Sequence, residues 1–78
     1  MTSLDRLTVG QRARIKGYRK GNAPLLQRLL EMGLIRGTEV QVLRFAPLGD
    51  PMEIAVRGYQ LSVRLHEAAQ IEVESISL

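Results

Sequence analysis

The stretch Asn22–Pro51, NAPLLQRLLEMGLIRGTEVQVLRFAPLGDP, carries the main helical signal of the chain and the signal that ends it. Asn22 predicts the start of a helix, because its side-chain oxygen can accept a hydrogen bond from a free amide of the first turn. Gly33 occupies the position just past the helix, where a left-handed backbone is usual, and in that register Leu34 folds back against Leu29. Four leucines at helical spacing predict one apolar stripe, namely Leu25, Leu26, Leu29 and Leu30.

A strand is predicted after this helix, over Glu39–Ala46. Val40 and Val42 point to one face, whereas Leu43 and Phe45 break that alternation. A strand that changes its buried face has bulged or bent, which is how small barrels turn their corners. The change of parity therefore places Leu43 and Phe45 off the face that carries the two valines.

Upstream of the helix, alternating residues predict a first strand with one buried face, interrupted at Gly10. The basic residues between the apolar ones fall on the opposite face, which predicts a solvated outer surface. The apolar positions of this strand are Leu7, Val9, Ala13 and Ile15.

Downstream, the alternating segments 52–56 and 59–65 predict two strands joined by a hairpin turn at Arg57-Gly58. Gly58 can supply the positive φ that such a turn requires. The residues His66–Gln70, HEAAQ, predict a single helical turn, and Ile71–Val73 a final short strand.

Five short strands and one helix cannot form a flat sheet with both faces covered. The compact alternative is a mainly β fold, a small, strongly twisted and partly closed barrel whose open end is covered by the helix between the first two strands. A chain of 78 residues predicts a single domain, 1–78. No apolar run approaches the ~20 residues that cross a bilayer, and the N-terminus lacks the apolar centre of a secretory signal, so we expect a cytoplasmic protein without membrane insertion.

Four segments stand in order along the chain: LTVGQRARI, LLEMGLIRG, EVQVLRFAPLGDP and AVRGYQLSVRLHEAAQIEV. In this order they resemble the FeoA family, small cytosolic proteins of ferrous-iron uptake. The resemblance covers nearly the whole chain and implies an SH3-like barrel that contacts the cytosolic GTP-binding domain of the FeoB transporter. The chain also resembles the C-terminal domain of DtxR-type repressors, so the alternative function is a free-standing sensory or oligomerisation module. A complete repressor would need a helix-turn-helix, for which the chain has no segment.

The sequence gives no support for catalysis, because it contains neither a nucleophile elbow nor a phosphate-binding loop. We therefore expect no enzyme activity and no cofactor. His66 is the single histidine and cysteine is absent, so a transition metal finds too few ligands, and at most His66 bridges chains weakly. The net charge is +3, but the basic residues are scattered and aromatic residues make up 4%, which disfavours nucleic-acid binding.

Apolar and basic residues near the turns are the best candidates for a partner-binding surface. Phe45 is the strongest single anchor, because aromatic anchors dominate interface energies. Two arginines would form a rim that orients an acidic partner. The candidate partner-binding residues are Phe45, Tyr59, Met32, Leu43, Arg44 and Arg57. Self-association remains open.

Overall fold

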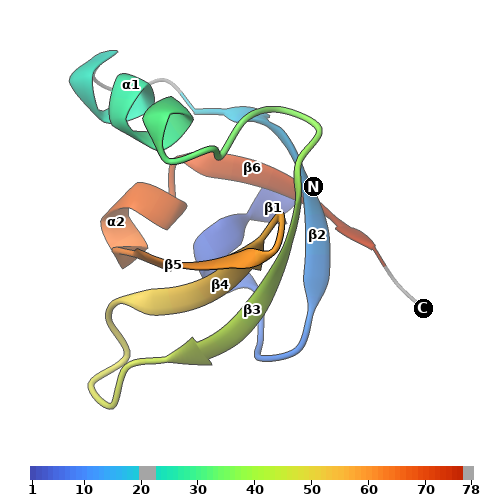
Figure 1. Cartoon of the computed structure of the whole chain (residues 1–78), viewed down its shortest axis with the longest axis vertical. Helices are drawn as coiled ribbons and strands as arrows, with labels where there is room; N and C mark the ends of the chain where they lie inside the picture. The colour runs from blue at the N-terminus through green and yellow to red at the C-terminus, as the bar shows by residue number, and fades with distance from the viewer. Residues whose placement is uncertain (20–22, 77–78) are drawn as a thin grey trace.

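The computed structural model describes residues 1–19 and 23–76. Within them, six strands form one antiparallel sheet in the order β1-β6-β2-β3-β4-β5 (Figure 1). The strands are β1 (Thr2–Ser3), β2 (Arg12–Tyr18), β3 (Glu39–Phe45), β4 (Met52–Val56), β5 (Tyr59–Val63) and β6 (Ile71–Ile76). The helices are α1 (Ala23–Glu31), α2 (Leu65–Ala68) and a short 3-10 helix, Leu4–Arg6.

The mainly β class is confirmed, but two expectations about the sheet are wrong. The described residues form six strands and not five, because β1 pairs with β6 through Thr2 and Ser3. The sheet is also not closed, since β1 and β5 lie at its two edges. A strand of two residues is too short to show any alternation, which explains why the sequence pattern missed β1.

The first two strands of the predicted pattern are β2 and β3. The helix predicted between them is α1, which covers one end of the sheet (Figure 1). The predicted turn at His66–Gln70 is the second short helix, α2, which begins one residue earlier. The predicted cap at Asn22 lies outside the described residues.

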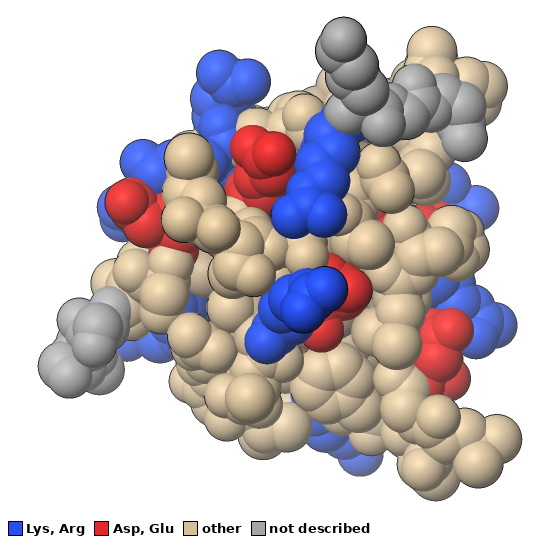
Figure 2. All heavy atoms as spheres, turned by 180° about the vertical axis from the view of Figure 1, so that it is seen from behind, with Lys and Arg blue, Asp and Glu red and all other residues tan. Residues whose placement is uncertain are grey.

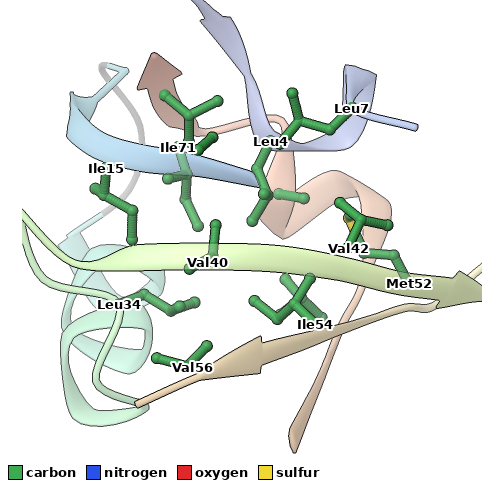
Figure 3. Packing of buried hydrophobic residues seen from close by; sticks show 14 of the residues in the cluster. Leu4, Leu7, Ile15, Leu34, Val40, Val42, Met52, Ile54, Val56 and Ile71 are labelled. Carbon is green, nitrogen blue, oxygen red and sulfur yellow. The ribbon is translucent and has the colours of Figure 1, made fainter. Parts of the chain in front are cut away.

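The concave side of the sheet holds one apolar core, to which five of the strands, the 3-10 helix, both α helices and the segment after α1 contribute (Figure 3). The predicted alternation is confirmed in β4, where Met52, Ile54 and Val56 are all fully buried. It is wrong for Val9, which lies in the turn before β2 and is 61% exposed. Gly10 ends the alternation there, so β2 begins only at Arg12.

The predicted bulge in β3 is confirmed, because the register with β4 shifts between Val42 and Arg44. The shift changes the expected position of Phe45. Val42 lies opposite Ile54, and Phe45 lies opposite Met52. Because directly opposed residues share a face, the bulge returns Phe45 to the face of the valines, and the expectation that it lies off that face is wrong.

Gly33 ends α1 as predicted, with φ of +90°. The amide of Leu34 donates to the carbonyl of Leu29 at 3.1 Å, and both leucines lie in the core. The predicted leucine stripe is only partly buried, since Leu26 and Leu30 are 37% and 41% exposed. The helix therefore meets the core along a narrower line than its leucine content suggests.

Two tyrosine hydroxyls hold the end of α1 from different strands. Tyr18 of β2 donates to the carbonyl of Leu34 at 2.6 Å, and Tyr59 of β5 donates to the carbonyl of Met32 at 2.6 Å. Burial raises the pKa of the Tyr18 phenol above its ordinary value, although the positive charge of Arg36 acts in the opposite direction. The hydroxyl therefore keeps its proton and remains a donor at neutral pH.

A buried carboxylate joins the two helices. Glu67 of α2 is 4% exposed, yet its side chain is fully used. One carboxylate oxygen accepts a hydrogen bond from the amide of Arg64 at 3.0 Å, and the other forms an ion pair with Nε of Arg28 in α1 at 3.0 Å. A buried carboxylate with both oxygens engaged avoids the penalty of an unpaired charge.

The first prediction concerns Gly33. We expect Gly33→Val to lower the free energy of unfolding by about 1 kcal/mol or more, because a β-branched residue resists positive φ. The added Cβ would also collide with the hydroxyl of Tyr59. Thermal melts of the variant and the parent measure the effect. In a Tyr59→Phe background the collision disappears and part of the loss should be recovered, whereas equal melting temperatures of Gly33→Val and parent would contradict the argument.

The second prediction concerns Glu67. We expect Glu67→Ala to cost about 1–3 kcal/mol of stability, because it leaves the partly buried amide of Arg64 without its acceptor and the Arg28 guanidinium without its carboxylate. Glu67→Gln keeps an acceptor for the amide of Arg64 and should cost less. Arg28→Gln should cost more than Glu67→Gln, since it leaves the buried carboxylate of Glu67 without its cation, but less than Glu67→Ala, which also removes the acceptor of the Arg64 amide. Chemical denaturation of the three variants measures their free energies of unfolding. A larger loss of stability for Arg28→Gln than for Glu67→Ala would refute the expected order.

Candidate functional site

Exposed apolar side chains lie on α1 and at the start of β5, where Tyr59 contacts the residues that follow α1. Tyr59 is 42% exposed, and Leu26 and Leu30 face solvent on α1. Met32, the residue whose carbonyl Tyr59 binds, is half-buried. We call this set, Leu26, Leu30, Met32 and Tyr59, the helix-end surface.

Tyr59 is the best defined member of the helix-end surface. Its hydroxyl is fixed by the bond to the Met32 carbonyl and lies against Gly33, where any side chain would collide with it. The aromatic ring is thus held in one place while part of it remains open to solvent. β5 is also an edge strand, so nothing in the described sheet covers its outer side.

Three of the six predicted residues lie elsewhere. Leu43, Arg44 and Phe45 are at the C-terminal end of β3, where Phe45 opposes Met52. Tyr59 opposes Val56, at the other end of β4. Since a strand rises about 3.3 Å per residue, the two groups are separated by roughly 13 Å along β4.

The environments of these three residues also differ from the expectation of a common patch. Phe45 is half-buried and packs against the core. The bulge leaves Leu43 half-buried and without a strand partner. Arg44 is held by Glu53, with Nε to Oε1 at 2.8 Å and a second contact at 3.3 Å. This fork-like pairing raises the pKa of Arg44 above its ordinary value, so the guanidinium is already engaged.

Arg57, the sixth predicted residue, lies in the hairpin turn between β4 and β5. The turn is confirmed, and both central residues have positive φ, +48° at Arg57 and +87° at Gly58. The Arg57 guanidinium donates to the hydroxyl of Thr38 at 3.2 Å, and Thr38 is itself buried. The structure therefore brings Tyr59 close to Met32 and separates both from the β3 group, while Arg57 lies two residues before Tyr59 in the chain.

The charged side chains form a mixed surface. Arg12 binds Glu39 at 2.7 Å, and Lys16 lies 3.4 Å from Glu74. Figure 2 shows the same interleaving of basic and acidic side chains over the face behind the view of Figure 1. A nucleic-acid surface would instead need a basic stripe with stacking aromatic residues.

The described residues contain no group of three or more metal-ligating side chains. His66 is exposed on α2, and its neighbour Glu67 is occupied by Arg28. None of the helices in residues 1–19 and 23–76 is long and apolar enough to cross a membrane.

The third prediction concerns iron. We expect the isolated monomer to bind Fe²⁺ no more tightly than a single exposed imidazole allows, because one histidine without cysteine offers too few good ligands. Anaerobic calorimetry with Fe²⁺ measures this directly. His66→Ala is the matched variant, and it should remove any residual weak signal. A stoichiometric micromolar site on the monomer would overturn the expectation.

Sequence reasoning missed Tyr18, Thr38 and Glu67. Each of them acts on a segment that is distant in the sequence, so no local pattern marks it. One signal was available for Tyr18: an aromatic residue with a polar tip at the end of a buried strand commonly finds a hydrogen-bond partner.

A model of the FeoA domain family matches residues 2–75. Among curated proteins, the chain is 39% identical over 74 residues to the Fe(2+) transport protein A/Fe(2+) transporter FeoB fusion protein of Porphyromonas gingivalis. That alignment covers 95% of this chain but only 9% of the fusion protein, so the chain spans a small part of its relative.

Solved structures agree with this match. An FeoA-like protein from Clostridium acetobutylicum superposes with a TM-score of 0.90 at 31% identity, covering 99% of this chain and 88% of that one. A zinc-bound FeoA from Stenotrophomonas maltophilia, described as a prokaryotic SH3-domain protein, gives 0.81 at 25% identity, with 95% and 91% covered. The fold is thus SH3-like, built here from an open sheet of six strands in the described residues.

The second resemblance, to metal-dependent repressors, is also confirmed. The manganese regulator SloR superposes with a TM-score of 0.82 at 27% identity. The match covers 96% of this chain and 34% of the regulator, so it concerns one module of a longer protein.

Proposed function

We propose a function that starts from the family: the chain belongs to the FeoA family. The proposed function is that of a small cytoplasmic accessory protein of bacterial ferrous-iron uptake. It acts by protein–protein contact with the cytosolic GTP-binding part of a FeoB-type transporter and carries out no chemistry of its own. The observation that carries this proposal is the fusion relative, in which a segment similar to this chain shares one polypeptide with FeoB.

The fusion arrangement has a physical consequence for this chain. A domain linked to its partner works at a high effective concentration and needs little intrinsic affinity. If this chain meets its transporter from solution, its own surface must supply the affinity. An accessible aromatic anchor on the surface is therefore what the proposed function requires.

We place the contact on the helix-end surface. The ring of Tyr59 is 42% exposed, and its hydroxyl is already fixed on the Met32 carbonyl. Binding would immobilise little additional side-chain freedom, so less free energy is lost on association. Phe45 is the second candidate, but its packing against the core means that its truncation also affects folding.

The mechanism follows from differential binding. A regulator without catalytic groups can change a transporter only by binding one of its conformations more tightly than another. By reciprocity, a nucleotide that favours the bound conformation of the transporter domain raises the affinity of that domain for this chain. Comparing the affinity with and without GTP analogues reports whether the contact senses the nucleotide state.

A second candidate function is a free-standing sensory or oligomerisation module, which the likeness to the manganese regulator favours. In that case the chain would self-associate or respond to a metal in the absence of any transporter. Sedimentation of the purified chain with and without Mn²⁺ and Fe²⁺ separates this function from the first.

The fourth prediction tests the contact. We expect Tyr59→Ala to weaken binding of the transporter's cytosolic GTP-binding domain by about 2 kcal/mol, as is usual for a central aromatic anchor. Tyr59→Phe keeps the ring and should bind nearly as well as the parent. Calorimetric titration measures affinity, and circular dichroism confirms that each variant is folded.

Two further variants complete this test. Val9→Ala truncates an apolar side chain that is 61% exposed elsewhere, so it should leave binding unchanged. Phe45→Ala should reduce stability before it reduces binding. If Tyr59→Ala folds and binds normally, the contact is not on the helix-end surface, and if the parent does not bind the domain, the proposed function itself fails.

A further inference from the structure

The outer face of the sheet is hollowed beside the turn between β4 and β5. The hollow has a volume of about 510 Å³. The cross-strand row Arg12, Gln41, Ala55 and Gln60 explains it, because a small alanine stands between longer side chains. The residues that line the hollow include Arg12, Glu39, Gln41, Ala55, Arg57 and Gly58. We call it the Arg57 hollow.

The charges of the Arg57 hollow do not cancel. Arg12 is matched by Glu39, with Nε to Oε2 at 3.0 Å and a terminal nitrogen to the same oxygen at 2.7 Å. Within the part of the chain that the structure describes, Arg57 forms no ion pair, and its side-chain bond is to the neutral hydroxyl of Thr38. One positive charge is therefore left over, and most donors of the Arg57 guanidinium fork remain available.

The backbone of Arg57 is unusual for this side chain. Turns with two positive φ values strongly favour Asn-Gly, Asp-Gly or Gly-Gly. Here an arginine adopts φ of +48° in front of Gly58. The conformation is unfavourable for a residue with a long side chain, and such residues concentrate at functional sites. The bond to buried Thr38 then fixes where the guanidinium lies.

We propose that the Arg57 hollow binds a single carboxylate, the side chain of an aspartate or glutamate presented by a loop of a partner protein. A guanidinium fork matches the two oxygens of a carboxylate. A phosphate group also fits a fork, but it carries about −1.5 to −2 charges at pH 7. The hollow offers a net charge of +1, and the carboxylate of Glu39 at its rim repels a dianion more strongly than a monoanion.

This inference rests on the proposed function only for the identity of the partner, and its first test needs no transporter. The full chain, labelled with ¹⁵N, is titrated at low salt with the capped peptide acetyl-GGEGG-amide and with acetyl-GGQGG-amide. We expect saturable shifts of the Arg57, Gly58 and Gln41 amides with the glutamate peptide alone, with a Kd on the order of millimolar. The shifts should shrink as salt rises.

Several results of this titration would overturn the inference. Equal shifts with the glutamine peptide would show that the carboxylate is not recognised. Stronger saturation by inorganic phosphate would show a general anion site. Arg57→Gln should abolish the response, while Arg6→Gln removes an exposed arginine of the 3-10 helix and should leave it intact.

A second variant separates binding from folding. Arg57→Asn creates the favoured Asn-Gly turn, so the melting temperature should rise by about 3 °C or more while the peptide response is lost. A fall in melting temperature would mean that Arg57 is kept for the fold, and a retained response would mean that another group binds; either contradicts the proposal.

With the transporter's GTP-binding domain, Arg57→Asn should weaken binding several-fold at low salt and little at high salt. A domain that binds parent and Arg57→Asn alike would exclude this hollow from the contact without affecting the peptide result.

Discussion

The end of α1 is the point on which the arrangement of this fold depends. The carbonyls on either side of Gly33 accept hydrogen bonds from Tyr18 and Tyr59, which belong to strands on opposite sides of the sheet centre. A helix end normally leaves its last carbonyls without partners inside the helix. Here the two hydroxyls satisfy carbonyls of this segment and also fix where the helix lies relative to the open sheet.

This attachment decides what the surface can do. The helix meets the core through Leu29 and, in part, Leu25, and its outer leucines remain exposed. The ion pair of Arg28 with buried Glu67 ties the helix a second time, to α2. Polar contacts thus hold the helix on both sides, and the exposed leucines add little to the core. These leucines, together with Tyr59 of β5, whose hydroxyl is already fixed, form the surface on which we propose the contact with another protein.

The sequence pattern was sufficient for three features whose structural cause is local. Gly33, the hairpin at Arg57-Gly58 and the bulge after Val42 were all predicted, because positive φ and strand parity are properties of neighbouring residues. The pattern failed where the cause is distant. Whether the residue after a bulge turns inward depends on its cross-strand partner, and for Phe45 that partner is Met52.

For the candidate site, too, the sequence predicted local properties but not those that depend on distant residues. Spacing along the chain identified apolar and basic residues with the right chemistry, but it could not group them, because grouping depends on which ends of β3 and β5 coincide in the sheet. The register separates Phe45 from Tyr59 by the length of β4. The burial of Glu67 could not be predicted from the sequence either, since its partner Arg28 belongs to another helix.

Positions 33 and 57 both require a backbone with positive φ, but they carry different residue types. Both have positive φ, and at Gly33 the sequence supplies the residue that adopts it without cost. Folding alone would favour the same solution at position 57, where asparagine or glycine would complete the hairpin. Natural sequences mostly agree with their local structure and depart from it at functional sites. The arginine therefore has a role besides the turn. Its guanidinium, anchored by Thr38, lies at a hollow whose one carboxylate, that of Glu39, is paired with Arg12, so no acidic residue of the described chain neutralises Arg57.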